Sequence, residues 1–247
     1  MKEAVEAFVI HLARATLRRP QVEKLLTELQ MPAGIIDAVD GLALSREEIA
    51  AVYRRNLHRP RYPFALRPTE IGCFLSHRKA WQAILDRKLD AGLIVEDDVA
   101  LDGALYPRLL AFVLDSLGET DVVRFPYRAY TDKGRIVARE GNLTLAEPRT
   151  IGLGMQMLLV SAGAAAALLD ATETFDRPVD TTIQMPGVKG TRVLVARPTA
   201  IRQIGHLLGG TIVQKKRKPA GEIVSREIRR TLYRGVVRLH ALKKCVR

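Results

Sequence analysis

A short apolar run that ends on three carboxylates is the feature that most limits how this chain folds. Residues 93–95, Leu-Ile-Val, have the character of a buried strand, and Glu96, Asp97 and Asp98 follow them directly. Like charges this close repel one another and are costly to remove from water. In open α/β sheets, ligands bind at the carboxyl ends of the strands, and this cluster lies at such an end.

The rest of the chain alternates between strand and helix patterns, which predicts an α/β fold with an open, mostly parallel sheet and flanking helices. The expected strands cover residues 5–12, 34–41 with the exit turn, 93–95, 122–125, 152–160 and 192–196. One expected helix begins near Pro20, a second spans 45–55 behind a Ser45 capping box, and a third begins at a Thr69 cap. A fourth spans 104–116, and a fifth follows a Ser161 cap. A hairpin is expected around residues 132–134.

The acidic cluster is a candidate site for a metal and a diphosphate. In an extended chain Glu96 and Asp98 point to one side, and Asp97 points to the other. Such oxygen ligands suit Mg²⁺ or Mn²⁺, which commonly bind one or two carboxylates together with substrate phosphates. The chain has no Walker loop and no GxGxxG motif, so a metal and basic residues would have to hold the phosphates. The alternative is that these carboxylates cap the next helix or face water.

Five stretches carry a resemblance to a known family. In the family's order they are FVIHLARATLRR (8–19), AVDG (38–41), EIGCFLSHRKAWQAIL (70–85), LIVEDDV (93–99) and RPVD (177–180). The chain resembles glycosyltransferase family 25, the bacterial lipopolysaccharide and lipooligosaccharide glycosyltransferases related to collagen galactosyltransferases. The resemblance implies a GT-A-like fold, a nucleotide-sugar donor, usually UDP-galactose, and inversion at the transferred sugar.

Three positions depart from the family pattern. His11 stands where Asn is expected, Leu17 stands where an acidic residue is common, and GLGMQM (152–157) lacks the aromatic residue of the family's Gly-rich strand. These departures bear on sugar and acceptor specificity more than on the fold. They also leave room for a poorly active relative.

The resemblance implies a role for each residue of the acidic cluster. Asp98 is the expected ligand of Mn²⁺ (or Mg²⁺), Glu96 is its partner, and Asp97 is expected to contact the donor ribose or sugar. A histidine near the end of GT-A-like domains can complete a metal site, so His206 is a further expected ligand. The alternative for His206 is an ordinary surface position.

The expected donor-binding residues are Leu12, Arg14, Thr16, Arg19, Asp40, His77 and Asp97. Arg14 or Arg19 could pair with the diphosphate, because a guanidinium suits phosphate bidentately. Their alternative is the solvated first turn of a helix. Asp40 is expected to bind the nucleoside or to form an Asx turn before a glycine. His77 either lines the donor site or is a hydrogen-bonded structural residue.

The expected catalytic base is Asp180, which ends the RPVD stretch. An inverting transfer needs a group that takes the proton of the acceptor hydroxyl during attack. The alternative is a carboxylate that only shapes a turn. Cys73 and Trp81 are expected in the core.

The last 33 residues carry most of the charge. Of the net +12, residues 215–247 supply +10, from twelve Lys or Arg and two Glu. The predicted division is therefore a glycosyltransferase domain at 1–214 and a basic tail at 215–247. Apolar tail residues recur at helical spacing: Val224, Ile228, Leu232, Val236, Leu239 and Leu242. A basic amphipathic helix of this kind lies in a membrane interface, and docking on the domain by the same stripe is the alternative.

The sequence therefore predicts an inverting, metal-dependent enzyme that moves a sugar from a UDP-sugar to a glycan such as lipopolysaccharide. It is expected in the cytoplasm, because no apolar run reaches about 20 residues, the N-terminus lacks the apolar core of a secretory signal, and its two distant cysteines suit reduced thiols. The basic amphipathic tail would hold it on the inner face of the membrane. Two alternatives stay open. One is a nucleic-acid-binding protein acting through the tail, although the tail has few aromatic residues for stacking. The other is an inactive scaffold.

Overall fold

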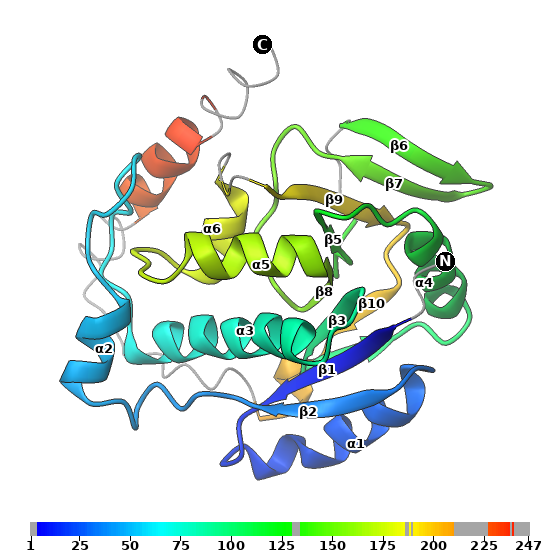
Figure 1. The fold of residues 1–247 in the computed structure, drawn as a ribbon, viewed down its shortest axis with the longest axis horizontal. Coiled ribbons are helices and arrows are strands. Elements are labelled where there is room, and N and C mark those ends of the chain that lie inside the picture. Colours follow the sequence, from blue (N-terminus) through cyan, green and yellow to red (C-terminus); the bar gives the residue numbers. More distant parts are fainter. Residues whose placement is uncertain are drawn as a thin grey trace.

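The computed structural model describes residues 4–129, 134–185, 188, 190–209, 227–237 and 239. At its centre lies an eight-stranded sheet (Figure 1). Its order is β2-β1-β3-β8-β5-β9-β7-β6. Within the described residues six strands share one direction, and β8 and β7 run against them. The expected α/β fold with an open, mostly parallel sheet is confirmed, and the two reversed strands make the sheet a mixed one. The strands are β1 (Val5–His11), β2 (Ala33–Asp37), β3 (Ala91–Glu96), β5 (Asp121–Arg124), β6 (Arg135–Glu140), β7 (Leu143–Glu147), β8 (Met157–Ser161) and β9 (Arg192–Arg197).

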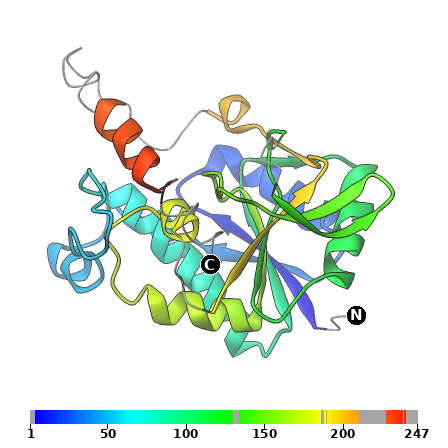
Figure 2. The same cartoon turned by 90° about the horizontal axis from the view of Figure 1, so that it is seen from above.

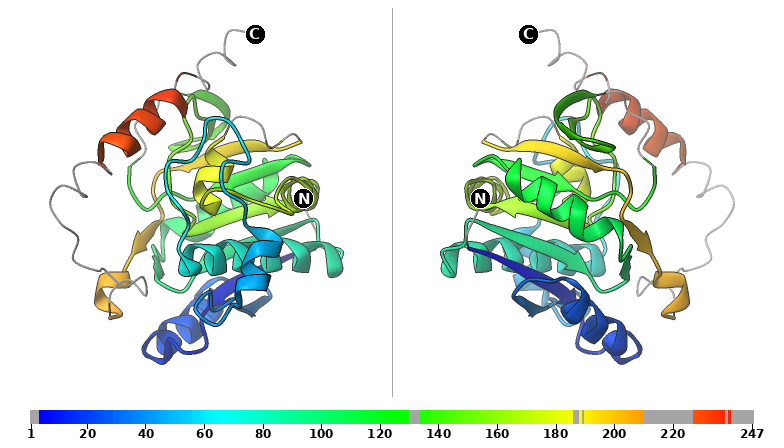
Figure 3. Two further views of the ribbon diagram at one scale, coloured as in Figure 1. Left: turned by 90° about the vertical axis from the view of Figure 1, so that its left-hand side faces the viewer. Right: turned by 90° about the vertical axis from the view of Figure 1, so that its right-hand side faces the viewer.

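Helices cover both faces of the sheet (Figure 3). On one face α1 (Arg19–Glu28) and α4 (Leu105–Asp115) pack against alternate residues of the central strands. On the other face lie α3 (Pro68–Asp86), α5 (Ala162–Ala171) and α6 (Val179–Gln184). The alternation of buried residues along β1 shows why: Ala7 and Val9 belong to the first core, whereas Phe8 and Ile10 belong to the second.

Three parallel strands end together, and this places the site. Val9 of β1 is level with Ile35 of β2 and Val95 of β3, and Ile10 is level with Glu96. The carboxyl ends of β1, β2 and β3 therefore share one edge of the sheet. Beyond that edge runs a two-stranded pair, β4 (Val99–Leu101) with β10 (Ile201–Gln203), followed by the short helix η2 (Gly205–Leu207).

Two glycines let the turn after β2 touch the first turns of α3. A Cβ on Gly41 would lie 1.8 Å from the carbonyl oxygen of Pro68, and a Cβ on Gly72 would lie 2.5 Å from that of Val39. Ser76 fastens the same contact, because its hydroxyl donates to the Gly72 carbonyl and accepts from the Val39 N–H. The AVDG and EIGCFLSH stretches are therefore two halves of one backbone contact.

Some element boundaries differ from expectation. The strand expected over 152–160 begins only at Met157, because Gly154 has φ +104° and the carbonyls of 152–154 bind the Arg124 side chain instead of a neighbouring strand. A hairpin turns at Gly141, between β6 and β7, whereas the hairpin predicted around 132–134 falls on residues 132 and 133, which lie outside the described residues. Helix α3 begins at Pro68, so Thr69 is not its cap. The strand at 192–196 is followed by β10 and is not the last.

The C-terminal helix (residues 227–237) lies beside the loop that joins α2 (Arg46–Val52) to α3, as Figures 1 and 2 show. Its buried residues are Tyr233 and Val237, and the Tyr233 ring meets Tyr62 edge-on at 5.4 Å between centroids. The predicted stripe faces away: Ile228 and Leu232 are 56% and 65% exposed. The alternative that the tail docks on the domain through this stripe is therefore wrong for the described helix, because it docks through the face that carries Tyr233 and Val237.

The remaining tail predictions fall largely outside the described residues. The 214/215 boundary lies there, as do Val224 and Leu242. Among the described helices, none is long and apolar enough to cross a membrane.

Candidate donor site

A pocket of about 290 Å³ opens at the carboxyl edge of β1, β2 and β3. Six of the predicted site residues line it: Leu12, Arg14, Asp40, Glu96, Asp97 and Asp98. Arg18 and Gln203 also line it and were not predicted. The described residues around the pocket do not include Thr16, Arg19, His77, His206 or Asp180. The structure thus brings together residues from five separate stretches of the chain, since α3 also contributes to the lining.

Asp97 is held by two buried side chains. Its Oδ2 lies 2.9 Å from Nδ1 of His11, at the end of β1, and its Oδ1 accepts a 2.5 Å hydrogen bond from the Arg18 guanidinium. All three residues are less than 10% exposed. Because both oxygens already have partners inside the protein, Asp97 neutralises Arg18 and fixes the start of the turn that carries Asp98.

Asp98 is the carboxylate of the cluster whose charged form is disfavoured by its surroundings. Residues 97 and 98 form a turn between β3 and β4 and do not continue the extended strand. Desolvation, and then the charge of Glu96, raise the pKa of Asp98 from 3.8 to about 6, although Arg18 at 3.9 Å opposes the rise. Its Oδ1 is buried and has no hydrogen-bond partner among the described residues.

These carboxylates fit a hard divalent cation. A carboxylate oxygen without a hydrogen-bond partner lies beside a second carboxylate at the edge of a pocket, and such oxygens are the ligands that Mg²⁺ and Mn²⁺ prefer. The chain closes over it at Gly205, where a Cβ would lie 2.6 Å from Oδ2 of Asp98. His206 follows on η2 with an exposed side chain, so its role as a ligand stays a prediction.

The loop before β8 makes hydrogen bonds with Arg124, Asp180 and Glu96. The Arg124 guanidinium donates to the carbonyls of Gly152, Leu153 and Gly154, and the Gly154 N–H donates to Oδ2 of Asp180 at 3.3 Å. The same loop reaches Glu96, whose N–H donates to the carbonyl of residue 156. Asp180, in the first turn of α6, is thereby tied to the loop that contacts Glu96.

Comparison with known proteins decides the family. The model of glycosyltransferase family 25, described as LPS biosynthesis protein, matches residues 4–183, which is most of the chain. The chain belongs to this family. The match runs from β1 to α6 and so contains every residue of the pocket except Gln203.

Curated relatives in family 25 match less of the chain. Human procollagen galactosyltransferase 2 is 34% identical over 120 residues, which are 47% of this chain and 19% of that protein. A human protein named inactive glycosyltransferase 25 family member 3 is 36% identical over 107 residues, 42% of this chain and 18% of that one. The chain thus spans about a fifth of the length of the curated relatives it matches. Among solved structures, a glycosyltransferase involved in the glycosylation of the major capsid of PBCV-1 is 11% identical to this chain. The match covers 78% of this chain and 81% of that one, with a TM-score of 0.40.

Other predicted donor residues of this family 25 chain have partners within the protein. Arg14 and Asp40 form a two-bond ion pair at the pocket mouth, which, with the Leu42 N–H, lowers the pKa of Asp40. The Leu42 bond is the Asx turn that was the alternative for Asp40, and it leaves donor binding untested. Arg19 turns outward to Glu23 on the exposed side of α1.

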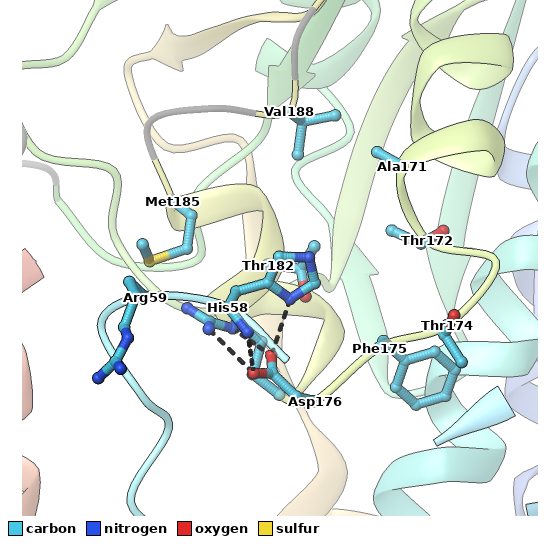
Figure 4. A pocket seen from close by; sticks show the side chains of 11 residues that line it. His58, Arg59, Ala171, Thr172, Thr174, Phe175, Asp176, Thr182, Met185 and Val188 are labelled. Atoms are coloured by element: carbon cyan, nitrogen blue, oxygen red, sulfur yellow. Dashed lines mark hydrogen bonds and ion pairs between the residues drawn. The ribbon is translucent and has the colours of Figure 1, made fainter. Parts of the chain in front are cut away.

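The RPVD stretch of the family pattern has a visible structural role. Asp176 and Arg177 are buried, and Figure 4 shows Asp176 bonded to His58 beside a second cavity of about 180 Å³. Arg177 also donates to the carbonyl of Pro60 and to the Tyr233 hydroxyl. These bonds fix the backbone just before Asp180, on the side where the C-terminal helix docks.

Asp98→Asn is expected to stabilise the metal-free protein by about 1–3 kcal/mol at pH 7.5. The raised pKa means that the charged carboxylate costs folding free energy above pH 6, and this cost disappears as the pH falls below the unfolded value near 4. The gain should therefore be largely lost at pH 4. Urea unfolding at the two pH values measures it. A variant that is less stable than the parent at pH 7.5 would show that Asp98 holds the fold.

Proposed function

We propose that this family 25 chain is an inverting, metal-dependent glycosyltransferase that moves a sugar from a UDP-sugar to a glycan acceptor. The observation that carries the proposal is the pocket itself: Glu96 and Asp98, with one orphaned carboxylate oxygen, at the strand ends where such sheets bind ligands. We propose galactose as the sugar because the matched relatives are named procollagen galactosyltransferases. The family's description supports lipopolysaccharide as the acceptor.

In the proposed mechanism each group has one task. Glu96 and Asp98 would hold Mn²⁺ or Mg²⁺, and such an ion would supply positive charge for the diphosphate that leaves with the nucleotide. Arg14 can exchange its partner Asp40 for a phosphate oxygen at the pocket mouth. Asp180 takes the proton from the acceptor hydroxyl as that oxygen attacks the anomeric carbon from the face opposite the leaving group.

A donor screen tests this function. Hydrolysis and transfer are measured for a panel of UDP-sugars with Mn²⁺ and with chelator, and nucleotide binding is followed by thermal shift. We expect turnover with UDP-galactose and Mn²⁺, and none with chelator or with Asp98→Asn. Binding without any turnover would favour an inactive scaffold, which the similarity to proteins named inactive makes a specific second candidate.

For the tail we propose a peripheral contact with an anionic, cytoplasmic membrane surface. The stripe residues Ile228, Leu232 and Val236 are exposed, and Arg229 and Arg234 flank them. An apolar face with neighbouring cations fits a lipid interface, where each cation contributes about 1 kcal/mol. The contact would hold the enzyme beside a lipid-linked acceptor.

Substitution on the two faces of the C-terminal helix tests this contact. Ile228→Ser with Leu232→Ser is expected to abolish sedimentation with vesicles that contain anionic lipid, while thermal stability stays unchanged because both side chains are exposed. Tyr233→Phe alters the docked face by removing the hydroxyl that accepts from Arg177 and donates to the Met185 sulfur. It is the matched control and should still sediment. Unchanged sedimentation of the double variant would rule the stripe out, and unfolding would assign it to the core.

A further inference from the structure

A second cluster of possible metal ligands lies between α3 and the end of β3, next to the donor site. Cys73 and His77 stand one helical turn apart on α3, so their side chains share a face. Glu96 faces them from the end of β3. One ligand atom from each of the three residues lies within 4.8 Å of the other two. Cys73 was expected in the core, but its side chain is exposed and lines the donor pocket.

The histidine of this cluster packs beside the Trp81 ring, but its polar atoms are not used by the fold. His77 is 1% exposed, yet neither ring nitrogen has a hydrogen-bond partner among the described residues. Its Nε2 lies 3.7 Å from Oε1 of Glu96, which is beyond a hydrogen bond. A buried imidazole without a partner costs free energy unless something binds it. The gap between His77, Cys73 and Glu96 is where a ligand would lie.

We propose that Cys73, His77 and Glu96 form a binding site for a borderline-soft divalent cation of the Zn²⁺ class. Thiolate, imidazole and carboxylate are the ligands of zinc in proteins, with bonds of about 2.0–2.3 Å, so small side-chain rotations bring all three atoms to one ion. Three protein ligands leave a fourth position for water, as in open zinc sites. The thiolate separates this site from the carboxylate pair Glu96 and Asp98, which suits harder ions.

The two sites share Glu96, and this gives the second site a consequence. A cation bound by Cys73 and His77 draws the Glu96 carboxylate toward α3 and away from the donor diphosphate. Zinc is therefore expected to weaken nucleotide binding in the presence of Mn²⁺ by roughly 10–100-fold, the usual effect of disturbing a metal's supporting ligands. This consequence rests on the proposed function, whereas the cation site does not.

Cobalt titration of the full chain tests the site directly. Co²⁺ serves as the probe because its bond to a thiolate gives a near-ultraviolet charge-transfer band, and four-coordination gives intense visible bands. We expect both to saturate at one equivalent, to be displaced by Zn²⁺ and to be lost in Cys73→Ser. His77→Gln should weaken binding, and the exposed Cys73 keeps the test decisive if that buried substitution disturbs folding.

Two further variants serve as controls. Cys245→Ser removes the chain's only other cysteine, and Asp98→Asn removes the expected ligand of the harder ion. Both should keep the cobalt spectrum. A parent protein without a charge-transfer band, or a band that survives Cys73→Ser, would overturn the site. A normal cobalt spectrum in a chain that transfers no sugar would defeat the proposed function alone.

Discussion

Asp97→Asn is expected to lower the free energy of unfolding by about 3–5 kcal/mol, the usual cost of removing one partner from a buried ion pair. Asp97 is 5% exposed and is the near partner of the Arg18 guanidinium, which is itself buried. The amide keeps the shape and can still accept one hydrogen bond. It cannot balance the positive charge of Arg18, and the carboxylate of Asp98 lies farther from that guanidinium, at 3.9 Å.

The neighbouring carboxylate is the matched control. Asp98→Asn makes the same chemical change one residue later, where the structure predicts the opposite sign at pH 7.5. Urea unfolding of both variants at this pH, without metal, therefore separates buried pairing from charge repulsion within a single turn. A loss below about 1 kcal/mol in Asp97→Asn, the range of exposed ion pairs, would contradict the buried clamp.

Elements fixed by local chemistry could be predicted from the sequence. Helix α2 has the reciprocal Ser45–Glu48 capping box, and the Ser161 hydroxyl accepts the Ala164 N–H at the start of α5. Strand β1 was predicted to within one residue. In each case the deciding residues lie within four positions of one another, or along one continuous apolar run, so the signal is contained in the segment itself.

Elements that depend on distant partners were missed. Strands β4 and β10 have three residues each and exist because they pair with each other across about a hundred positions. The apolar stretch at 152–156 reads as a strand, but the Arg124 guanidinium takes its carbonyls and holds it as a loop. No local sequence pattern predicts either the β4–β10 pairing or the contact of Arg124 with this loop.

The acidic cluster of the candidate site was found from sequence, but its basic partner was not. The sequence favoured Arg14 and Arg19 for the diphosphate, whereas Arg18 is the buried cation of the pocket. The spacing of Arg14 and Arg18, four positions apart, was a usable signal that both lie on one side of a turn. Which side faces the sheet depends on the short 3-10 helix at Thr16–Arg18, which has no strong sequence signature.

Asp180→Asn is expected to reduce turnover by a factor of roughly 10² to 10⁴, the usual contribution of general acid–base catalysis. The two oxygens of Asp180 accept from different N–H groups, Oδ2 from Gly154 and Oδ1 from Thr181, so the amide can keep only one of these bonds. With its oxygen turned toward Gly154, it still holds the loop before β8 in place. It cannot take a proton from an acceptor hydroxyl. The KM for the donor and the thermal stability should therefore change little, while kcat falls.

A purely structural Asp180 would behave differently, and the difference is measurable. If the carboxylate only anchors Gly154, the variant loses stability and donor affinity together, because that loop continues to the N–H contact with Glu96. If it is the base, the acidic limb of the kcat profile against pH disappears in the variant and the remaining slow rate is flat. Asp170→Asn, an exposed carboxylate at the end of α5, is the matched control and should match the parent in every measurement. Full turnover in Asp180→Asn would remove this residue from the chemistry and leave the base to be sought elsewhere around the pocket.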